Sequence, residues 1–428
     1  MKKIIIISYF FPPSNFVGGE RAYGWSKHFH KYGYFPIIIT RKWNENQIEI
    51  TDKIKNNKLE IEKNEFYEIH RLKYKRTLRD YFSNYEFLKL FQKSLTFIEL
   101  FLSNFFLKSL PFYNFYKYSL RLIKNQNDIY AVIISGSPFQ SFHIGYKLKK
   151  KFSKILWVPD YRDEWTTRST SKPNSFSEKI IFYFNNKSEN KWTSNSDFFL
   201  TVTEKWRNNI SHKISKNGVI IKNGFNYENN LDYLKKSNEI KKDKKSFKII
   251  YIGTLYPYQR IEIFINAIIN LINENNNITV YFIGVEILKN ELERLKKLTQ
   301  SYEDVFKIVN KLNKKELHKY LISCDLALAT RYENLKGCMP VKIFDYYLFK
   351  LPILLCPSDK DEIENFILEN KAGYIANTQE ECEDVINKII KKKKIGKAIT
   401  IENSDNLNNY SRNYQTKLLA KYLSDKKL

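Results

Sequence analysis

The segment around residues 337–345 has the residue types that grip a nucleoside diphosphate. Pro340 suits the first position of a helix, where its missing N–H costs nothing, and the free backbone N–H groups of a helix start attract anions. Gly337 would allow close approach of the backbone, and Lys342 in the first turn could reach a phosphate. Asp345, three residues on, shares that helical face and could accept hydrogen bonds from ribose hydroxyls. The alternative is a surface helix with an ordinary lysine and aspartate.

A second candidate phosphate ligand lies in the segment GTLYPYQRIE. Arg260 follows the apolar run Phe247–Ile252, which predicts a strand, and opens the next helix. In an open parallel sheet, the loop after a strand lies at the carboxyl edge, where ligands bind. Arg260 could therefore pair with a diphosphate through two hydrogen bonds. The alternative is an ordinary surface arginine at a helix start.

Acidic side chains crowd the end of another apolar strand, in the segment PDYRDEWT. Asp160, Arg162 and Asp163 could pair internally as a structural salt bridge, or one of the two carboxylates could support acceptor activation or sugar binding. His143 follows Pro138 near a helix start and is a further candidate for catalysis. A single histidine on a helix is more often packed or exposed, so a structural role for His143 stays open.

The elements that must position these residues repeat in the two halves of the chain. Each half opens with an apolar run, a loop, a helical stretch and a second apolar run, which predicts a β-loop-α-β unit. We therefore expect an α/β fold of two Rossmann-like domains with parallel sheets. Neither half has the G-x-G-x-x-G pattern of dinucleotide-binding folds. The units are Ile4–Ser8, Glu20–Tyr32 and Pro36–Thr40 in the first half, and Phe247–Ile252, Ile261–Leu271 and Ile278–Ile283 in the second.

The polar, lysine-rich segment 228–246 is the best candidate for a linker. It separates an N-terminal domain, 1–227, from a C-terminal domain, 247–404. The last residues, 405–428, have helical periodicity and could pack back on the N-terminal domain. An aromatic and basic region, 66–124, lies within the first domain. It is either a helical insert that packs in the core or an amphipathic surface that docks on an anionic membrane leaflet.

The composition sets broad limits on what the protein can be. The 428 residues are 43% hydrophobic and 16% aromatic, which excludes global disorder. The net charge of +26 is typical of proteins that meet nucleic acid, anionic membranes or phosphorylated substrates, although a general lysine bias would also produce it. The four cysteines form no C-x-x-C pair, which favours free thiols in a reducing cytosol over a zinc site. No uncharged apolar stretch of about 18 residues occurs, so we expect no membrane span.

Taken in order along the chain, these motifs resemble those of retaining glycosyltransferases of family 4, which have the GT-B architecture of two Rossmann-like domains. The resemblance is to bacterial members that build surface polysaccharides. It covers most of the chain outside 45–125 and the linker. The segments that carry it are SYFFPPSNFVGGERAYGWSKHFHKYGYFPIIIT, PDYRDEW, TVTEKW, IIKNGF, YIGTLYPYQRIE, PVKIFDYYLFKLPILL and NKAGYIA.

The resemblance implies roles for individual residues. Gly18 and Gly19 would lie under the donor or the acceptor. Arg260 and Lys342 would bind the donor diphosphate, and Asp345 would bind the ribose.

The chain departs from the family pattern at one point of this helix. The family often has two glutamates eight residues apart; here the second is Asp345, and Gly337 takes the place of the first. Related surface-polysaccharide members also have a lysine between the two positions, as Lys342 is here. The usual contact to the donor sugar is therefore left without an assigned residue.

The function implied is transfer of a sugar, with retention, from a nucleotide sugar to a saccharide acceptor, most simply a lipid-linked one. The protein would be cytoplasmic and peripheral on the inner face of the cytoplasmic membrane. We expect no metal or other cofactor, because Arg260, Lys342 and the helix start would stabilise the leaving diphosphate and no D-x-D pair is placed to hold a metal. A catalytically silent GT-B scaffold is one alternative. A basic nucleic-acid-binding protein is another, but no recognised module is present, so we expect no nucleic-acid partner.

Overall fold

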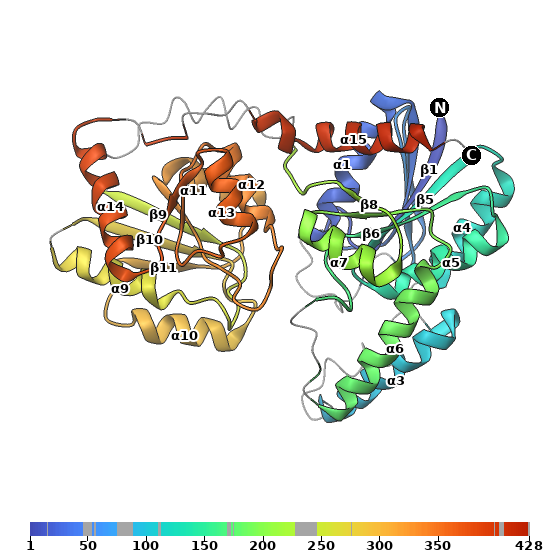
Figure 1. Ribbon diagram of the computed structural model, residues 1–428, viewed down its shortest axis with the longest axis horizontal. Helices are drawn as coiled ribbons and strands as arrows, with labels where there is room; N and C mark the ends of the chain where they lie inside the picture. The colour runs from blue at the N-terminus through green and yellow to red at the C-terminus, as the bar shows by residue number, and fades with distance from the viewer. Residues whose placement is uncertain are drawn as a thin grey trace. The chain divides into compact units, whose positions relative to one another are not determined.

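The chain folds into two units, one formed by Met1–Lys222 with Arg412–Leu428 and the other by Asn223–Ser411. Each unit is α/β with a largely parallel sheet, as the sequence predicted (Figure 1). The computed structural model describes residues 1–14, 16–45, 54, 57–74, 89–109, 113–168, 173, 175–226, 246–274, 276–397, 399–401 and 406–426. The expected linker, 228–246, lies outside the described residues except for Ser246.

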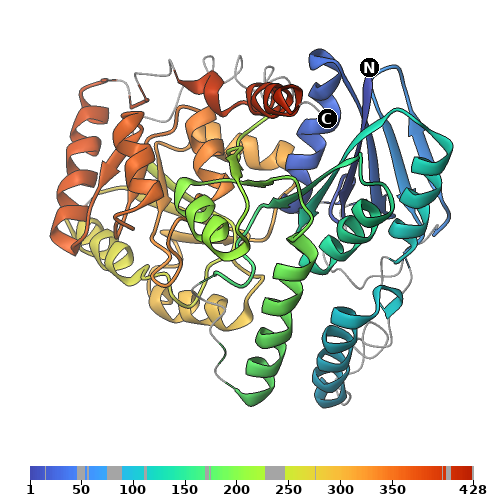
Figure 2. The same ribbon diagram turned by 45° about the vertical axis from the view of Figure 1, so that its right-hand side comes forward.

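The first unit is built on one extended sheet. Its strands are β1 (Lys2–Ser8), β2 (Tyr34–Arg41), β3 (Glu60–Lys63), β4 (Glu68–Leu72), β5 (Ile129–Gly136), β6 (Leu156–Tyr161), β7 (Phe199–Thr201) and β8 (Gly218–Ile220). They are ordered β3-β4-β2-β1-β5-β6-β7-β8, and only β3 runs antiparallel to its neighbour. Ile4 to Ile7 are almost completely buried, as in a strand covered on both faces (Figure 2). The order reverses between β1 and β5, so the carboxyl ends of these strands flank a switch point, where α/β sheets bind ligands.

The helix after β1 begins at a glycine pair. A 3-10 turn, Val17–Gly19, leads into α1 (Glu20–His28), and a second 3-10 turn, Phe29–Tyr32, completes the helical stretch that the sequence predicted. Gly33 ends it with a φ of +83°, a left-handed conformation that favours glycine.

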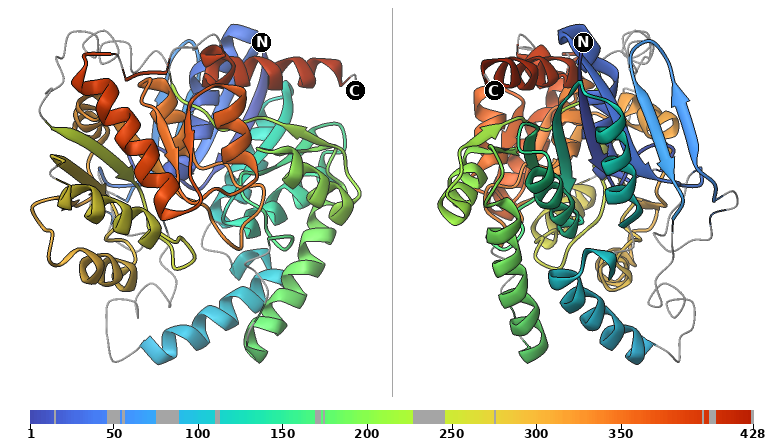
Figure 3. Two further views of the ribbon diagram at one scale, coloured as in Figure 1. Left: turned by 60° about the vertical axis from the view of Figure 1, so that its left-hand side comes forward. Right: turned by 90° about the vertical axis from the view of Figure 1, so that its right-hand side faces the viewer.

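The aromatic and basic region is divided between the sheet and two helices. Glu68–Leu72 is strand β4, which pairs in parallel with β2 near the edge of the sheet (Figure 3). The region is therefore not one insert, because residues near its start form a strand of the sheet. It continues with α3 (Lys89–Phe105) and α4 (Tyr113–Asn125). Lys75, Arg76 and Arg79, three basic residues of this region, lie outside the described residues.

The remaining helices of the first unit are α5 (Phe142–Lys151), α6 (Phe176–Thr193), α7 (Glu204–Ile214) and α15 (Arg412–Asp425). The last of these is contributed by the end of the chain and lies beside α1 (Figure 1). Leu419 and Leu423 are fully buried in the same core as Trp25 of α1. The Tyr130 hydroxyl of β5 donates a hydrogen bond to the Leu423 carbonyl at 2.7 Å. The first unit is therefore completed only by residues beyond the second.

The second unit has a parallel sheet with the strand order β11-β10-β9-β12-β13-β14. These are β9 (Phe247–Ile252), β10 (Ile278–Ile283), β11 (Phe306–Val309), β12 (Leu326–Ala329), β13 (Ile353–Leu355) and β14 (Gly373–Ile375). The helices are α9 (Glu262–Asn273), α10 (Lys289–Thr299), α11 (Lys314–Ser323), α12 (Val341–Leu348), α13 (Glu362–Glu369) and α14 (Gln379–Lys394). The order reverses between β9 and β12, which places a second switch point at their carboxyl ends.

Among the described residues, no helix has the length and apolar character needed to cross a bilayer.

Candidate functional site

Arg260 lies in the loop between β9 and α9, at the switch point of the second unit. Its side chain is 61% exposed, and its Nε lies 2.6 Å from Oε1 of Glu333. Nη2 of Arg331 donates to the same oxygen at 2.7 Å. Both Arg331 and Glu333 follow the carboxyl end of β12. The structure therefore brings two guanidinium groups to one carboxylate oxygen at the edge where ligands bind.

Lys342 lies in the first turn of α12. The helix begins at Val341, and Pro340 precedes it as an extended capping residue rather than as the first helical residue. The Lys342 ammonium lies 3.6 Å from the centroid of the Tyr251 ring. Burial lowers the pKa of Lys342 to about 7, against a smaller upward effect of the Cys338 thiolate. The Lys342 amine therefore lies in partly apolar surroundings that disfavour its protonated form. An anion bound beside it would favour the protonated form again.

Asp345 lies one turn beyond Lys342 on α12. Both side chains are half-buried, whereas Ile343, Phe344 and Tyr346 between and beside them are buried. The two polar residues thus share the outward face of the helix, the arrangement required for one ligand to touch both.

Gly337 precedes this helix in a left-handed conformation. Its φ is +74°, which a side chain would strain. Its amide donates to Oδ2 of Asp361 at 2.6 Å, so this N–H is engaged by the loop after β13. Asp361 was not singled out by the sequence, since it lies 24 residues away.

A cluster of tyrosines lies beside these cations, and sequence analysis did not identify it. The rings of Tyr256 and Tyr258 are nearly parallel, with centroids 5.5 Å apart. The ring of Tyr332 lies 6.0 Å from the first and 6.2 Å from the second. The three tyrosines are half-buried, and burial raises the pKa of Tyr332 well above its usual value. Tyr256 and Tyr258 are visible in the segment YPYQR, but their contact with Tyr332 depends on β9 pairing with β12.

In the first unit, Gly18 and Gly19 lie in closely packed surroundings. A Cβ at Gly18 would collide with the Arg162 guanidinium, and one at Gly19 would lie 2.8 Å from the Phe11 Cα. Arg162 also lies 3.5 Å from the half-exposed carboxylate of Asp163. The structure thus brings Gly18, Arg162 and Asp163 together at the switch point between β1 and β5. A ligand contact there stays a prediction.

Asp160 has a different partner from the one that the sequence suggested. Its carboxylate is fully buried and bonds Nε of Arg21 at 3.0 Å, rather than Arg162. The Ser135 hydroxyl donates to its other oxygen at 3.0 Å, and Arg21 also donates to the Ile221 carbonyl at 2.5 Å. Desolvation raises the pKa of Asp160 and lowers that of Arg21, against the attraction between them. In this geometry the pair joins α1 to the sheet, and Asp160 does not reach solvent.

His143 is the second candidate that the structure places in the interior. Its ring stacks on Trp192 with centroids 4.8 Å apart. Burial, with the charges of Lys147 and Lys191, lowers the pKa of His143 to about 4. The imidazole is therefore neutral near pH 7 and packs as a core residue, which is the structural alternative considered for it.

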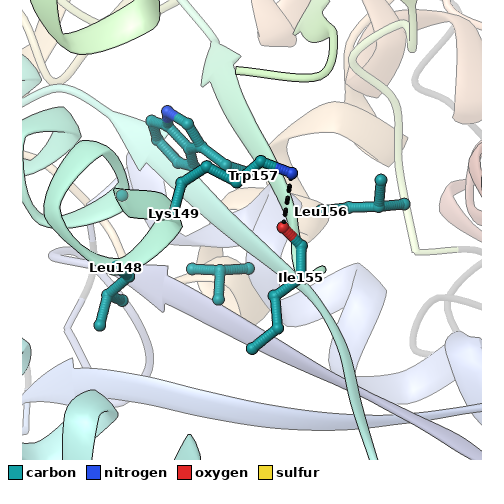
Figure 4. Close-up of a pocket in the computed structure, with 7 residues that line it drawn as sticks. Leu148, Lys149, Ile155, Leu156 and Trp157 are labelled. Atoms are coloured by element: carbon teal, nitrogen blue, oxygen red, sulfur yellow. Dashed lines mark hydrogen bonds between the residues drawn. The ribbon is translucent and has the colours of Figure 1, made fainter. Parts of the chain in front are cut away.

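A shallow pocket between α5 and the start of β6 is lined mainly by apolar groups, including Val132, Leu148, Ile155 and Leu156 (Figure 4). Gly145 in its wall lies against the Trp157 ring. The pocket lacks the convergent polar groups of a ligand site. Among the described residues, no group of three or more His, Cys, Asp and Glu side chains is placed to hold a metal ion.

Comparisons with known proteins agree with this architecture. Residues 246–392, from β9 into α14, match the family described as "Glycosyl transferases group 1". Sucrose-phosphate synthase from Thermosynechococcus elongatus aligns with a TM-score of 0.68 at 13% identity over 99% of both chains. A glycosyltransferase from Rickettsia africae aligns with a TM-score of 0.60 at 13% identity over 99% of this chain and 98% of its own. Anabaena HepE, solved with UDP and glucose, aligns with a TM-score of 0.56 at 13% identity over the whole of both chains.

At these identities the structural likeness establishes the fold, and that fold is the GT-B architecture that the sequence predicted. No curated protein matches the chain in sequence. The match of residues 246–392 to this family, together with the shared fold, supports a glycosyltransferase enzyme.

Proposed function

We propose that the protein is a retaining glycosyltransferase that moves a sugar from a nucleotide sugar to a saccharide acceptor in cell-surface polysaccharide synthesis. The observation that carries the proposal is the convergence of cations at the switch point of the second unit. Arg260 lies in the loop after β9, and Lys342 lies in the first turn of α12, which follows β12; both belong to the edge where a parallel sheet binds its ligand.

Each of these groups has a part in the proposed reaction. The leaving nucleoside diphosphate gains negative charge as the bond to the sugar breaks, and preformed cations stabilise that charge. Arg260 and Lys342 are these cations, and the backbone N–H groups at the start of α12 add to the stabilisation. Asp345, one turn further on, accepts hydrogen bonds from the ribose hydroxyls. We propose that no metal is needed, because these groups already neutralise the diphosphate.

Binding measurements test the role of the two cations. We expect Arg260→Ala and Lys342→Ala each to weaken UDP or GDP binding by about 1.5–3 kcal/mol, since each removes a charge-assisted hydrogen bond. The melting temperature should stay nearly unchanged for Arg260→Ala, because this side chain is largely exposed. Isothermal titration calorimetry gives the affinities.

Lys388→Ala is the matched control, because Lys388 is exposed on α14 of the same unit. It should bind the nucleotide like the wild type. Wild-type affinity in both Arg260→Ala and Lys342→Ala would remove these residues from the site. Tight nucleotide binding without any transfer or hydrolysis would favour the catalytically silent scaffold.

We further propose that the acceptor is lipid-linked and that the first unit brings the enzyme to the membrane. On α3, the apolar residues Phe91, Ile98 and Leu102 follow helical spacing and are all exposed. A neighbouring side of α3 packs on α6, where the rings of Phe101 and Phe105 lie 4.9 Å and 5.5 Å from the ring of Phe184. The exposed apolar stripe therefore remains after the two helices have paired.

Helix α6 adds a mixed stripe of aromatic and basic side chains. Phe176, Lys179, Tyr183 and Lys187 recur at helical spacing and are exposed, Phe176 by 80%. The Lys187 ammonium lies 4.5 Å from the Tyr183 ring. Figure 2 shows α3 and α6 extending away from the sheet of the first unit. Aromatic and basic side chains in this combination suit the interface of an anionic bilayer, which supports a cytoplasmic enzyme peripheral to the membrane.

A further inference from the structure

The tyrosine cluster of the second unit is more than packing. Tyr256, Tyr258 and Tyr332 remain half-buried, although aromatic side chains of this size are usually covered where a core is available. Their rings converge from two loops, one after β9 and one after β12. Ligand sites commonly combine such aromatic walls with a few placed polar groups.

Glu333 supplies the polar group beside this wall. Arg260 and Arg331 both bond its Oε1, and Oε2 accepts no hydrogen bond from the described residues. Two guanidinium groups on one carboxylate leave one positive charge in excess, which the donor diphosphate would neutralise by pairing with Arg260. If Arg260 paired with a diphosphate, Glu333 would keep its ion pair with Arg331, and its Oε2 could accept a hydrogen bond from the ligand.

The position of this cluster along the proposed ligand follows from α12. Asp345 lies one turn inside the helix, and Lys342 lies in its first turn. A nucleotide sugar with its ribose at Asp345 and its diphosphate at Lys342 therefore has its sugar beyond the helix start. The loop that precedes α12 contains Tyr332 and Glu333.

We propose that Tyr256, Tyr258, Tyr332 and Glu333 form the subsite for the transferred sugar of the donor, and that this sugar is a neutral pyranose. The proposal rests on the nucleotide-sugar function proposed above. The tyrosine rings cover the C–H face of the pyranose, and Oε2 of Glu333 accepts a hydrogen bond from one of its hydroxyls. A sugar carboxylate has no proton to donate to Oε2, whereas a sugar hydroxyl has one.

Calorimetric titration of the full chain tests this subsite. The ligands are UDP, GDP, UDP-glucose, UDP-galactose, UDP-N-acetylglucosamine, GDP-mannose and UDP-glucuronic acid. We expect the wild type to bind a neutral nucleotide sugar and to bind UDP-glucuronic acid about tenfold more weakly or worse. Tyr258→Leu should weaken binding of the neutral nucleotide sugar about three- to tenfold. The corresponding nucleotide without the sugar should bind Tyr258→Leu as tightly as it binds the wild type. Tyr258→Phe should bind both the nucleotide and the nucleotide sugar with wild-type affinity.

Glu333→Gln should affect the affinity for the nucleotide and the affinity for the nucleotide sugar differently. Loss of the carboxylate frees Arg260 from its partner, so the parent nucleotide should bind as well as before or more tightly. The neutral nucleotide sugar should bind about tenfold more weakly, and the discrimination against UDP-glucuronic acid should shrink. Glu293→Gln is the control, because Glu293 is an exposed residue of α10 in the same unit, and it should change none of these affinities.

The outcomes separate this inference from the proposed function. Wild-type protein that binds neither UDP nor GDP would overturn the proposed function itself. Nucleotide binding without binding of any neutral nucleotide sugar would overturn the subsite alone. An equal loss of nucleotide and nucleotide sugar in Tyr258→Leu would assign the tyrosines to the nucleotide, and unchanged affinities in both variants would remove the cluster from the site.

Discussion

At the scale of single residues, Lys342 shows how burial prepares a side chain for an anionic ligand. Its ammonium lies on the face of Tyr251, and burial brings its pKa to about 7. A lysine in water stays charged far above this pH. The protein therefore holds a cation that is only partly protonated at neutral pH until a phosphate arrives.

This predicts a pH dependence of nucleotide binding. A bound diphosphate favours the charged ammonium and raises its pKa. Below pH 7 the lysine already has its proton, but above pH 7 binding must take one up, which costs up to about tenfold in affinity per pH unit. We expect UDP affinity to fall between pH 7 and pH 9, with proton uptake measurable by calorimetry in buffers of different ionisation enthalpy.

Lys342→Arg provides the matched comparison, since a guanidinium stays charged over this range. Its affinity for UDP should be nearly flat between pH 7 and pH 9. Identical, flat profiles in the two proteins would show that Lys342 does not titrate at the nucleotide site.

At the scale of elements, α3 and α6 each bury one side against the other and leave a second side exposed. The exposed stripes are the structural basis of the proposed membrane contact. Basic groups near an anionic surface contribute about 1 kcal/mol each, and inserted apolar side chains add to this.

Vesicle sedimentation tests these two helices. The wild type should sediment with anionic phosphatidylglycerol vesicles, be released by high salt, and bind neutral phosphatidylcholine vesicles poorly. Phe91→Ser with Phe176→Ser should reduce sedimentation several-fold, because these side chains are 64% and 80% exposed. UDP binding, which we assign to the second unit, should not change.

Leu368→Ser is the control for this experiment, because Leu368 is 60% exposed but belongs to α13 of the other unit. It should sediment like the wild type. Equal sedimentation with neutral and anionic vesicles, insensitive to salt, would leave the stripes as ordinary surface and favour a soluble acceptor.

At the scale of the whole molecule, the first unit is discontinuous in sequence. Its core contains Leu419 and Leu423 of α15, beyond the end of the second unit. Stability of the first unit should therefore depend on the last residues of the chain, whereas that of the second should not.

Leu419→Ala should destabilise the first unit by about 2–5 kcal/mol, the usual result of emptying a fully buried leucine site. Leu418→Ala is the adjacent control, because Leu418 is 36% exposed on the same helix. Thermal unfolding with and without UDP distinguishes the units, since ligand binding raises the transition of the unit that binds it. If Leu419→Ala lowered only the unfolding transition that UDP raises, this division of the molecule would be contradicted.

The repeated β-loop-α-β pattern and the helix boundaries near Gly33 and Pro340 were predictable from local sequence. These features are local, because strand and helix periods, glycine and proline act within a few residues. The carboxyl-edge position of Arg260 also followed from sequence, since it depends only on the loop following a parallel strand.

The contacts between distant side chains, in contrast, depend on how the elements pack. Asp160 pairs with Arg21, 139 residues away, and not with the adjacent Arg162. Arg260 reaches Glu333, and Tyr258 reaches Tyr332, because β9 lies beside β12 in the sheet. His143 became a packed residue because Trp192 of α6 covers it. Strand order and helix packing depend on burying apolar surface between segments far apart in the chain, so contacts that depend on them cannot be read from local spacing.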